Sequence, residues 1–209
     1  LIPHYNEGQR LDGVLDEIVK MKNLAEVICV DDGSSIDRTE ELKLKYPSVS
    51  FIRLDQNVGK TGAVEAGLKS VKSEWTMMID ADLQGLDHQE LQKAVKAINS
   101  KEMDMLILRR KNPMIAEKVT RGDLLYTGER ILRTMELIKI LASKKVVKWQ
   151  LESAINSYMY QNKKIVKWMY HSGRNLLKMQ KIGVKYSIMN EPRTFYDIVT
   201  GTENLREFL

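Results

Sequence analysis

Two carboxylates, Asp80 and Asp82, stand one residue apart at the end of an apolar run, in the sequence Ile79-Asp80-Ala81-Asp82-Leu83-Gln84. Alternate side chains of an extended segment point to the same side, so both carboxylates face one way. Hard oxygen ligands in this arrangement suit Mg²⁺ or Mn²⁺, and such an ion normally completes its shell with phosphate oxygens. A strand end capped by two solvated acids is the alternative, since short motifs recur by chance.

Two further loops carry acids, glycines and a lysine. The first reads Asp31-Asp32-Gly33-Ser34-Ser35 and the second reads Asn57-Val58-Gly59-Lys60-Thr61-Gly62-Ala63. A carboxylate at a strand end accepts hydrogen bonds from a base edge or a ribose, and glycine lets the backbone approach a ligand. Lys60, just before a helix expected to start near Gly62, would place a cation and a helix N-terminus beside a diphosphate. Each loop alone is also common turn chemistry, and the glycine spacing matches neither the P-loop nor the dinucleotide fingerprint.

These loops follow a regular alternation of predicted strands and helices. Short apolar runs at 27–30, 51–54, 75–79 and 103–108 each stop at polar residues. Helical periodicity lies between them, at 11–18 and at 91–98, the second after an Asp87 and Glu90 pair spaced like a capping box. The pattern predicts an α/β fold with a mostly parallel central sheet and helices on both faces. In such sheets ligands bind at the carboxyl ends of the strands.

The second half of the chain loses this alternation. Residues 131–141 and 151–160 are predicted helices, 165–169 a strand, 171–185 a basic segment and 192–209 a further helix. At the other end, the opening Leu1-Ile2-Pro3 is typical of the last turn of a strand, so we expect a fragment whose N-terminal strand is truncated.

Composition and charge limit the class of protein. A chain of 209 residues with 43% hydrophobic residues predicts one folded domain. Cys29 is the only cysteine, which excludes an intramolecular disulfide and a cysteine-based zinc site and makes a reducing compartment the expectation. No apolar run approaches the ~20 residues that span a bilayer. Residues 1–100 hold 12 basic and 17 acidic side chains, and residues 101–209 hold 21 and 11, so the two halves need different partners.

Four motifs taken in order resemble those of family 2 inverting glycosyltransferases, which have the GT-A nucleotide-diphospho-sugar transferase fold. They are Ile2-Pro3-His4-Tyr5-Asn6-Glu7, Val30-Asp31-Asp32-Gly33-Ser34, the loop from Asn57 to Ala63, and Asp80-Ala81-Asp82-Leu83-Gln84. The last form is most similar to the polyprenyl-phosphate sugar synthases, such as dolichyl-phosphate mannose synthase. The resemblance is close over 1–110 and looser to about 200. It implies a nucleotide-sugar and metal-binding half at 1–110 and an acceptor-binding half at 111–209 of the same domain.

The resemblance also implies roles for residues of the first half. It implies a nucleotide pocket lined by Pro3, Tyr5 and Glu7 with Asp32 at its base, and it places Lys60 near the diphosphate. Asp80, Asp82 and Gln84 would hold Mg²⁺ or Mn²⁺ between the donor phosphates, with Asp82 counted among the catalytic residues. A bound cation neutralises the charge that develops on a departing nucleoside diphosphate, so this set is chemically sensible.

Residues of the second half are implied on the acceptor side. Arg121 and Arg130 resemble arginines that approach the donor phosphates or a phosphorylated acceptor, a task that suits guanidinium groups; a solvated helix face is the alternative. Glu152 is the only acid among eleven bases between Lys139 and Lys185. It would be a general base for a hydroxyl acceptor and a positioning residue for a phosphate acceptor. His171 would complete the metal site, or be an ordinary packing histidine.

This sequence also departs from the family pattern. Trp149-Gln150 stands where a glycine is expected before Glu152, and the Gln-x-x-Arg-Trp motif of processive synthases is absent. The first change leaves the acceptor loop open, and the second argues against processive synthesis. Trp168 and Tyr170, near the basic segment, mark either a lipid interface or core packing.

We therefore expect a metal-dependent inverting transferase that moves a hexose from a UDP- or GDP-linked donor to a polyprenyl phosphate or a cell-envelope glycan. The expected location is cytoplasmic, at the inner face of the membrane, with the basic half in peripheral contact with anionic lipid. A sugar-phosphate nucleotidyltransferase is an alternative, although its glycine-rich N-terminal loop is missing. A non-catalytic nucleotide-sugar-binding subunit is another. No nucleic-acid partner is expected, because the basic stretch lacks a recognisable binding motif.

Overall fold

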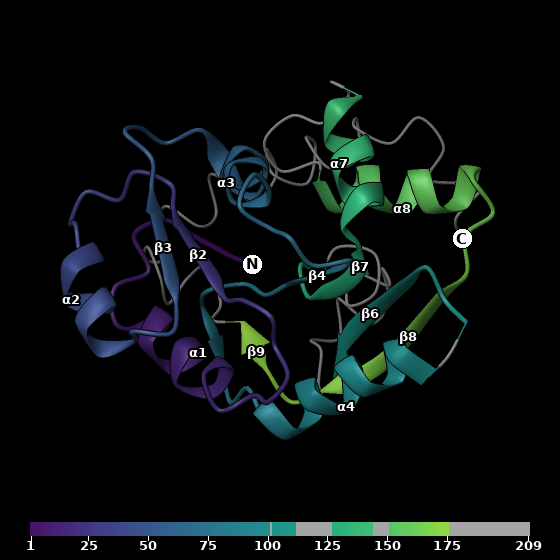
Figure 1. Cartoon of the computed structure of the whole chain (residues 1–209), viewed down its shortest axis with the longest axis horizontal. Helices are drawn as coiled ribbons and strands as arrows, with labels where there is room; N and C mark the ends of the chain where they lie inside the picture. The colour runs from purple at the N-terminus through teal and green to yellow at the C-terminus, as the bar shows by residue number, and fades with distance from the viewer. Residues whose placement is uncertain (101, 112–126, 144–150, 176–209) are drawn as a thin grey trace, which may run out of the picture.

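A computed structural model of the chain describes residues 1–100, 102–111, 127–143 and 151–175 (Figure 1). The first three strands form a parallel sheet in the order β1-β2-β3. These strands are β1 (Ile2–His4), β2 (Ile28–Asp31) and β3 (Ser50–Arg53). All four residues of β2 are buried, as expected for a central strand of a sheet covered on both faces.

A second sheet has the order β4-β7-β6-β8. It contains β4 (Trp75–Met78), β7 (Arg130–Arg133), β6 (Met105–Arg110) and β8 (Val166–His171). The strand β7 runs antiparallel to both of its neighbours, whereas β6 and β8 are parallel. Backbone bonds between the amide of Ile79 and the carbonyl of Leu1 (3.1 Å) and between the Leu1 amine and the Met77 carbonyl (2.8 Å) join β4 to the first sheet. The result is the predicted α/β sheet, mostly parallel, with one antiparallel strand inserted.

Helices cover both faces of this sheet, as the sequence predicts. Two of them, α1 (Arg10–Ile18) and α4 (His88–Ser100), lie below the strands in Figure 1 and share one apolar cluster. On the opposite face, α3 (Gly59–Leu68), α7 (Thr134–Ala142) and α8 (Leu151–Gln161) share a second cluster. The remaining elements are α2 (Thr39–Lys45) beside β3, and the short antiparallel pair β5 (Leu83–Gln84) and β9 (Arg174–Asn175). Among the described helices, none combines the length and the apolar composition that crossing a membrane requires.

Three local predictions need correction. The helix expected at 131–141 begins only at Thr134, because Arg130–Arg133 form β7, and a short apolar run cannot by itself distinguish a buried strand from a helix. The helix expected near Gly62 already begins at Gly59. The predicted capping box forms only in part. The Asp87 carboxylate accepts a bond from the amide of Gln89 (2.8 Å), but the Glu90 carboxylate accepts bonds from the amide and hydroxyl of Ser172 instead (2.6 Å each).

Residues 176–185 of the basic segment and the helix predicted at 192–209 lie outside the described residues.

Cys29 is fully buried in the centre of β2, opposite Ile2 and Phe51 on the neighbouring strands. Burial raises the pKa of its thiol to about 12. Because the thiolate is the reactive form, we expect no reaction with a thiol reagent such as DTNB at pH 8 while the protein is folded, and one equivalent after unfolding in guanidinium. Prompt labelling of the folded protein would show that β2 is not held in the centre of this sheet.

Candidate active site

A cavity of about 270 Å³ lies at the carboxyl ends of β1 and β2. Its polar lining includes His4, Asn6, Glu7, Asp31, Ser34 and Arg38. Of the residues predicted for the nucleotide, Glu7 lines this cavity, Pro3 is buried within β1, and Tyr5 is 45% exposed. A cavity at this edge of the sheet, lined by acids, an amide and an arginine, suits the base and ribose of a nucleotide.

Hydrogen bonds between two loops fix the mouth of this cavity. The backbone amide of Asn6 donates to the Ser34 hydroxyl (2.8 Å). The side-chain oxygen of Asn6 accepts a bond from the backbone amide of Ser35 (2.9 Å). Gly33 has a φ of 70°, and a Cβ there would come within 2.7 Å of the carbonyl carbon of Gln56. Gly33 therefore permits a turn and a backbone approach that another residue would obstruct.

The adjacent acids Asp31 and Asp32 have different tasks. The two oxygens of Asp32 accept bonds from the amides of Val58 and Gly59, both at 2.8 Å, and so hold the loop that begins α3. Asp31 lines the cavity, accepts a bond from the amide of Ser34 (2.8 Å), and pairs with Arg53. Asp31 is thus a site residue that the sequence reasoning missed, although it belongs to the motif that had been singled out. The Asp-Asp pair was the available signal.

Lys60 is the second residue of α3 and contacts acids from both halves of the chain. Its ammonium group donates to Asp80 Oδ1 (2.6 Å), at the end of β4, and to Glu152 Oε1 (2.7 Å), on α8. Burial alone would lower the pKa of Lys60, but the charges of Asp80 and Glu152 outweigh it and raise the pKa. For Asp80, burial would raise the pKa, but Lys60 outweighs it and lowers the pKa. Both groups are therefore charged at neutral pH. The structure brings three predicted site residues together here.

The segment before β7 packs directly onto this ion cluster. A Cβ on Gly128 would lie within 2.4 Å of Asp80 Oδ1 and 2.5 Å of the Lys60 ammonium, so a larger residue there would have to displace this ion pair. Arg130 is fully buried and donates to Asn156 Oδ1 (3.0 Å), to the Glu152 carbonyl (3.5 Å) and to the Thr127 carbonyl. Arg130 thereby holds α8, which carries Glu152, against β7. Its predicted contact with donor phosphates stays a prediction, and Arg121 lies outside the described residues.

Glu129 is a second residue that the sequence reasoning missed as a site residue. Its side chain is fully buried and lies within hydrogen-bonding reach of the Asp80 carboxyl group. Burial, followed by the charge of Asp80, raises the pKa of Glu129 to about 7. Thr127 donates to Glu129 Oε2, and Arg110 lies 3.7 Å from the same atom. Only the tertiary structure places this acid beside Asp80.

The other predicted metal ligands are Asp82, Gln84 and His171. Asp82 is 7% exposed, and Gln84 is exposed on β5. His171 is buried at the end of β8, and its Nδ1 accepts a bond from the amide of Gly173 (3.2 Å). Burial, and next the charge of Arg110, lower the pKa of His171 to about 4, so its imidazole is neutral at pH 7. The described residues do not gather Asp80, Asp82 and His171 into one group with ligand atoms within 4.8 Å of one another.

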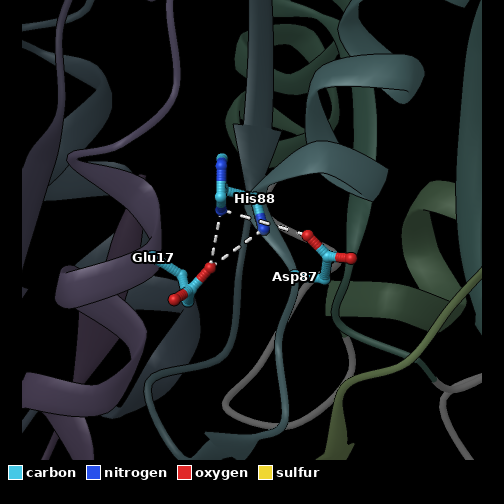
Figure 2. Close-up of side chains that lie close together, drawn as sticks. All are labelled: Glu17, Asp87 and His88. Atoms are coloured by element: carbon cyan, nitrogen blue, oxygen red, sulfur yellow. Dashed lines mark hydrogen bonds and ion pairs between the residues drawn. The ribbon is translucent and has the colours of Figure 1, made fainter.

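One group of three possible ligands does meet that distance within the described part of the chain. Figure 2 shows it between α1 and the start of α4, where Glu17 faces His88 and Asp87. Glu17 Oε2 accepts from the amide of His88 (3.1 Å) and lies 2.9 Å from its Nδ1, while its other oxygen pairs with Lys20. These contacts tie two helices together and account for the cluster without an ion.

Asp80 and Asp82 stay the predicted ligands of a divalent ion, and the environment of Asp80 is consistent with that role. Asp80 is ionised and already accepts a cation, the Lys60 ammonium, so its environment favours positive charge. Both carboxylates offer the hard oxygen donors that Mg²⁺ and Mn²⁺ prefer. The donor set fits such an ion at the carboxyl end of β4.

The chain is similar in sequence to known proteins. The family model for glycosyl transferase family 2 matches residues 1–172. The dolichyl-phosphate beta-glucosyltransferase ALG5A of Trichomonas vaginalis is 34% identical over 113 residues, covering 47% of this chain and 35% of the relative. The dolichyl-phosphate beta-glucosyltransferase of Saccharomyces cerevisiae is 29% identical over 148 residues, covering 65% and 44%. These matches thus span less than half the length of either relative.

A solved structure with the same fold contains a nucleotide and a metal. Glucosyl-3-phosphoglycerate synthase from Mycobacterium tuberculosis, in complex with Mn²⁺, uridine diphosphate and glucosyl-3-phosphoglycerate, superposes with a TM-score of 0.66. The two sequences are 15% identical, and the match covers 92% of this chain and 77% of that one. At this identity the likeness shows the fold alone, which is the predicted GT-A architecture. Because the family model matches residues 1–172, which is most of the chain, this protein belongs to glycosyl transferase family 2.

Proposed function

We propose that this protein is an inverting, metal-dependent transferase that moves a hexose from a nucleotide diphosphate sugar to a polyprenyl phosphate. The observation that carries the proposal is the buried cluster in which Lys60 bridges Asp80 and Glu152. Asp32 fixes the loop that leads to Lys60, and its neighbour Asp31 lines the cavity. A nucleotide in the cavity would therefore have its diphosphate directed toward a lysine, a helix N-terminus and the acids that suit a metal.

Different residues bind different parts of the donor. The cavity takes the base and ribose, and Lys60 and α3 take the diphosphate. Asp80 and Asp82 hold Mg²⁺ or Mn²⁺, with Gln84 and His171 as the further ligands that the family resemblance implies. When bound, the ion neutralises the charge that collects on the departing diphosphate. The structure of the mycobacterial synthase, which contains Mn²⁺ and uridine diphosphate, supports a metal and a uridine nucleotide for this fold.

The transfer is a single displacement at the anomeric carbon. An acceptor oxygen forms the new bond from the face opposite the diphosphate, and the bond to the diphosphate oxygen breaks with its electron pair. The product is a sugar of inverted configuration and a free nucleoside diphosphate. A phosphate oxygen is already anionic and has no proton to lose, so this acceptor needs no general base. Glu152 then acts by positioning Lys60, which matches its ion pair.

Relatives guide the choice of acceptor. The names of the Trichomonas and yeast proteins specify dolichyl phosphate, and a 29% identical relative from Rhizobium johnstonii is a dodecaprenyl-phosphate galacturonate synthase. A lipid acceptor implies contact with a membrane surface. On β8, Trp168 and Tyr170 are about half exposed and both lie against the Arg109 guanidinium, an arrangement that suits an anionic interface.

Metal and nucleotide should bind together. We expect UDP or GDP at about 100 times its Kd to raise the melting temperature by on the order of 5 to 10 °C when Mn²⁺ is present, and to have little effect without it. Asp82→Asn should abolish the shift, because it removes a charged metal ligand. Differential scanning fluorimetry measures both.

Asp87→Asn is the matched control for this experiment. Asp87 is also an acid in a possible ligand group, but that group lies between α1 and α4 (Figure 2), so the shift should survive. If neither nucleotide gives a metal-dependent shift in the wild-type protein, the donor half of the proposal is wrong.

Lys60 should also stabilise the fold. Lys60→Met leaves Asp80 and Glu152 as buried carboxylates without their ammonium partner, which should cost about 3–5 kcal/mol of unfolding free energy at pH 7. Urea denaturation measures this loss. Lys69→Met, at the exposed end of the same helix, serves as the control and should change little. A loss below about 1 kcal/mol would mean that the Lys60 ion pairs do not form in solution.

The acceptor is tested with full-length protein, Mn²⁺, and UDP-glucose, UDP-N-acetylglucosamine or GDP-mannose. We expect release of nucleoside diphosphate from one donor when a polyprenyl phosphate is present in vesicles, and only background release with the neutral polyprenol. Vesicles that contain anionic lipid should support faster transfer than neutral vesicles, because each exposed Lys or Arg near the surface contributes about 1 kcal/mol. Equal rates with polyprenol and polyprenyl phosphate would rule out the phosphate acceptor.

A further inference from the structure

The buried acid Glu129 has an incomplete set of partners. Its Oε2 accepts a bond from the Thr127 hydroxyl and lies 3.7 Å from Arg110. Its Oε1 is buried, and within the described residues no group donates a hydrogen bond to it. Another acid, Asp80, lies within hydrogen-bonding reach of the Glu129 carboxyl group. Leaving a buried carboxylate oxygen without a donor is unfavourable, so such an arrangement needs an explanation.

The charges around Glu129 indicate what is missing. The cluster contains three acids, Asp80, Glu129 and Glu152, and three bases, Lys60, Arg110 and Arg130. Lys60 pairs with Asp80 and Glu152, and Arg130 donates to two carbonyl groups and to Asn156, so neither base supplies the donor that Oε1 lacks. Two carboxyl groups in contact need a proton or a cation between them.

We propose that Glu129 is a ligand of the divalent cation, paired with Asp80, and that it makes this site bind the metal before any nucleotide arrives. The inference rests on the proposed function, which supplies the metal. It adds Glu129 to the metal ligands named there. Carboxylate oxygen is the donor that Mg²⁺ and Mn²⁺ prefer, and Oε1 has a lone pair available for it. Glu129 is held in place for this role by Thr127 on its other oxygen.

The competing explanation is purely structural. In that case Glu129 carries a proton, donates it to Asp80 and simply fills the space beneath β7. The two explanations differ for the isosteric variant Glu129→Gln. An amide can still donate to Asp80 and accept from Thr127, so the structural role survives. The amide carries no charge, so a ligand role is lost or much weakened.

The experiment measures Mn²⁺ binding to the protein alone, from the loss of the electron paramagnetic resonance signal of the free ion. We expect Glu129→Gln to weaken Mn²⁺ binding about tenfold or more, and Glu129→Asp to recover part of it. Glu136→Gln is the control, because Glu136 is likewise a buried acid that accepts a bond from a hydroxyl, that of Tyr158. This control should bind Mn²⁺ like the wild type. Thermal unfolding of each variant establishes that it is folded.

Mn²⁺ affinity in Glu129→Gln within twofold of the wild type would overturn the proposal, and so would a wild type that binds no Mn²⁺ alone up to millimolar concentration. Either result can be separated from a failure of the proposed function. If the Mn²⁺-dependent shift with nucleotide is still observed, only the role of Glu129 fails. If that shift is absent as well, the metal-dependent transferase fails with it.

Discussion

A buried ammonium group must be surrounded by negative charge, and this requirement at Lys60 organises the site. Lys60 is supplied by α3, Asp80 by the end of β4, and Glu152 by α8, so one cation fixes the relative positions of three elements. The backbone at Gly128 approaches so closely that a side chain there would displace the ion pair. Removing any partner would leave an uncompensated charge in a place that water reaches poorly, which costs several kcal/mol. The geometry is thus maintained by electrostatics as much as by packing.

The insertion of β7 brings residues of the second half of the chain to the cluster. A purely parallel sheet would place only the carboxyl ends of its strands at this edge. Because β7 runs antiparallel between β4 and β6, the residues just before it, Thr127 to Glu129, arrive at the carboxyl end of β4, beside Asp80. Arg130 then anchors α8 through Asn156 and the Glu152 carbonyl. Residues from the first and the second half of the chain therefore meet at a single cluster.

The sequence predicted those features that depend on neighbouring residues along the chain. Short apolar runs ending in polar residues predicted β2, β3, β4 and β6 and placed Lys60 and Asp80 near one edge of the sheet. It failed at β7, because a short apolar run has no period that separates strand from helix. The sequence also could not predict that Asp31 lines the cavity whereas Asp32 holds the loop before α3. Adjacent acids have the same chemistry, and only the backbone decides which way each side chain points. Glu129 could not be recognised, because its neighbour Asp80 is 49 residues away in the sequence.

The buried acids also bear on the order of binding. Asp80, Glu129 and Glu152 lie together at this site, and Asp82 follows Asp80 in the loop after β4. A nucleoside diphosphate is itself an anion, and its approach to buried carboxylates is unfavourable in a medium of low dielectric constant. A divalent cation bound to these acids would turn that repulsion into attraction. The cation should therefore precede the diphosphate, and the product diphosphate should leave more readily once the cation is lost. The proposed metal requirement of the donor site would then follow from the acids around Lys60, whatever sugar the nucleotide carries.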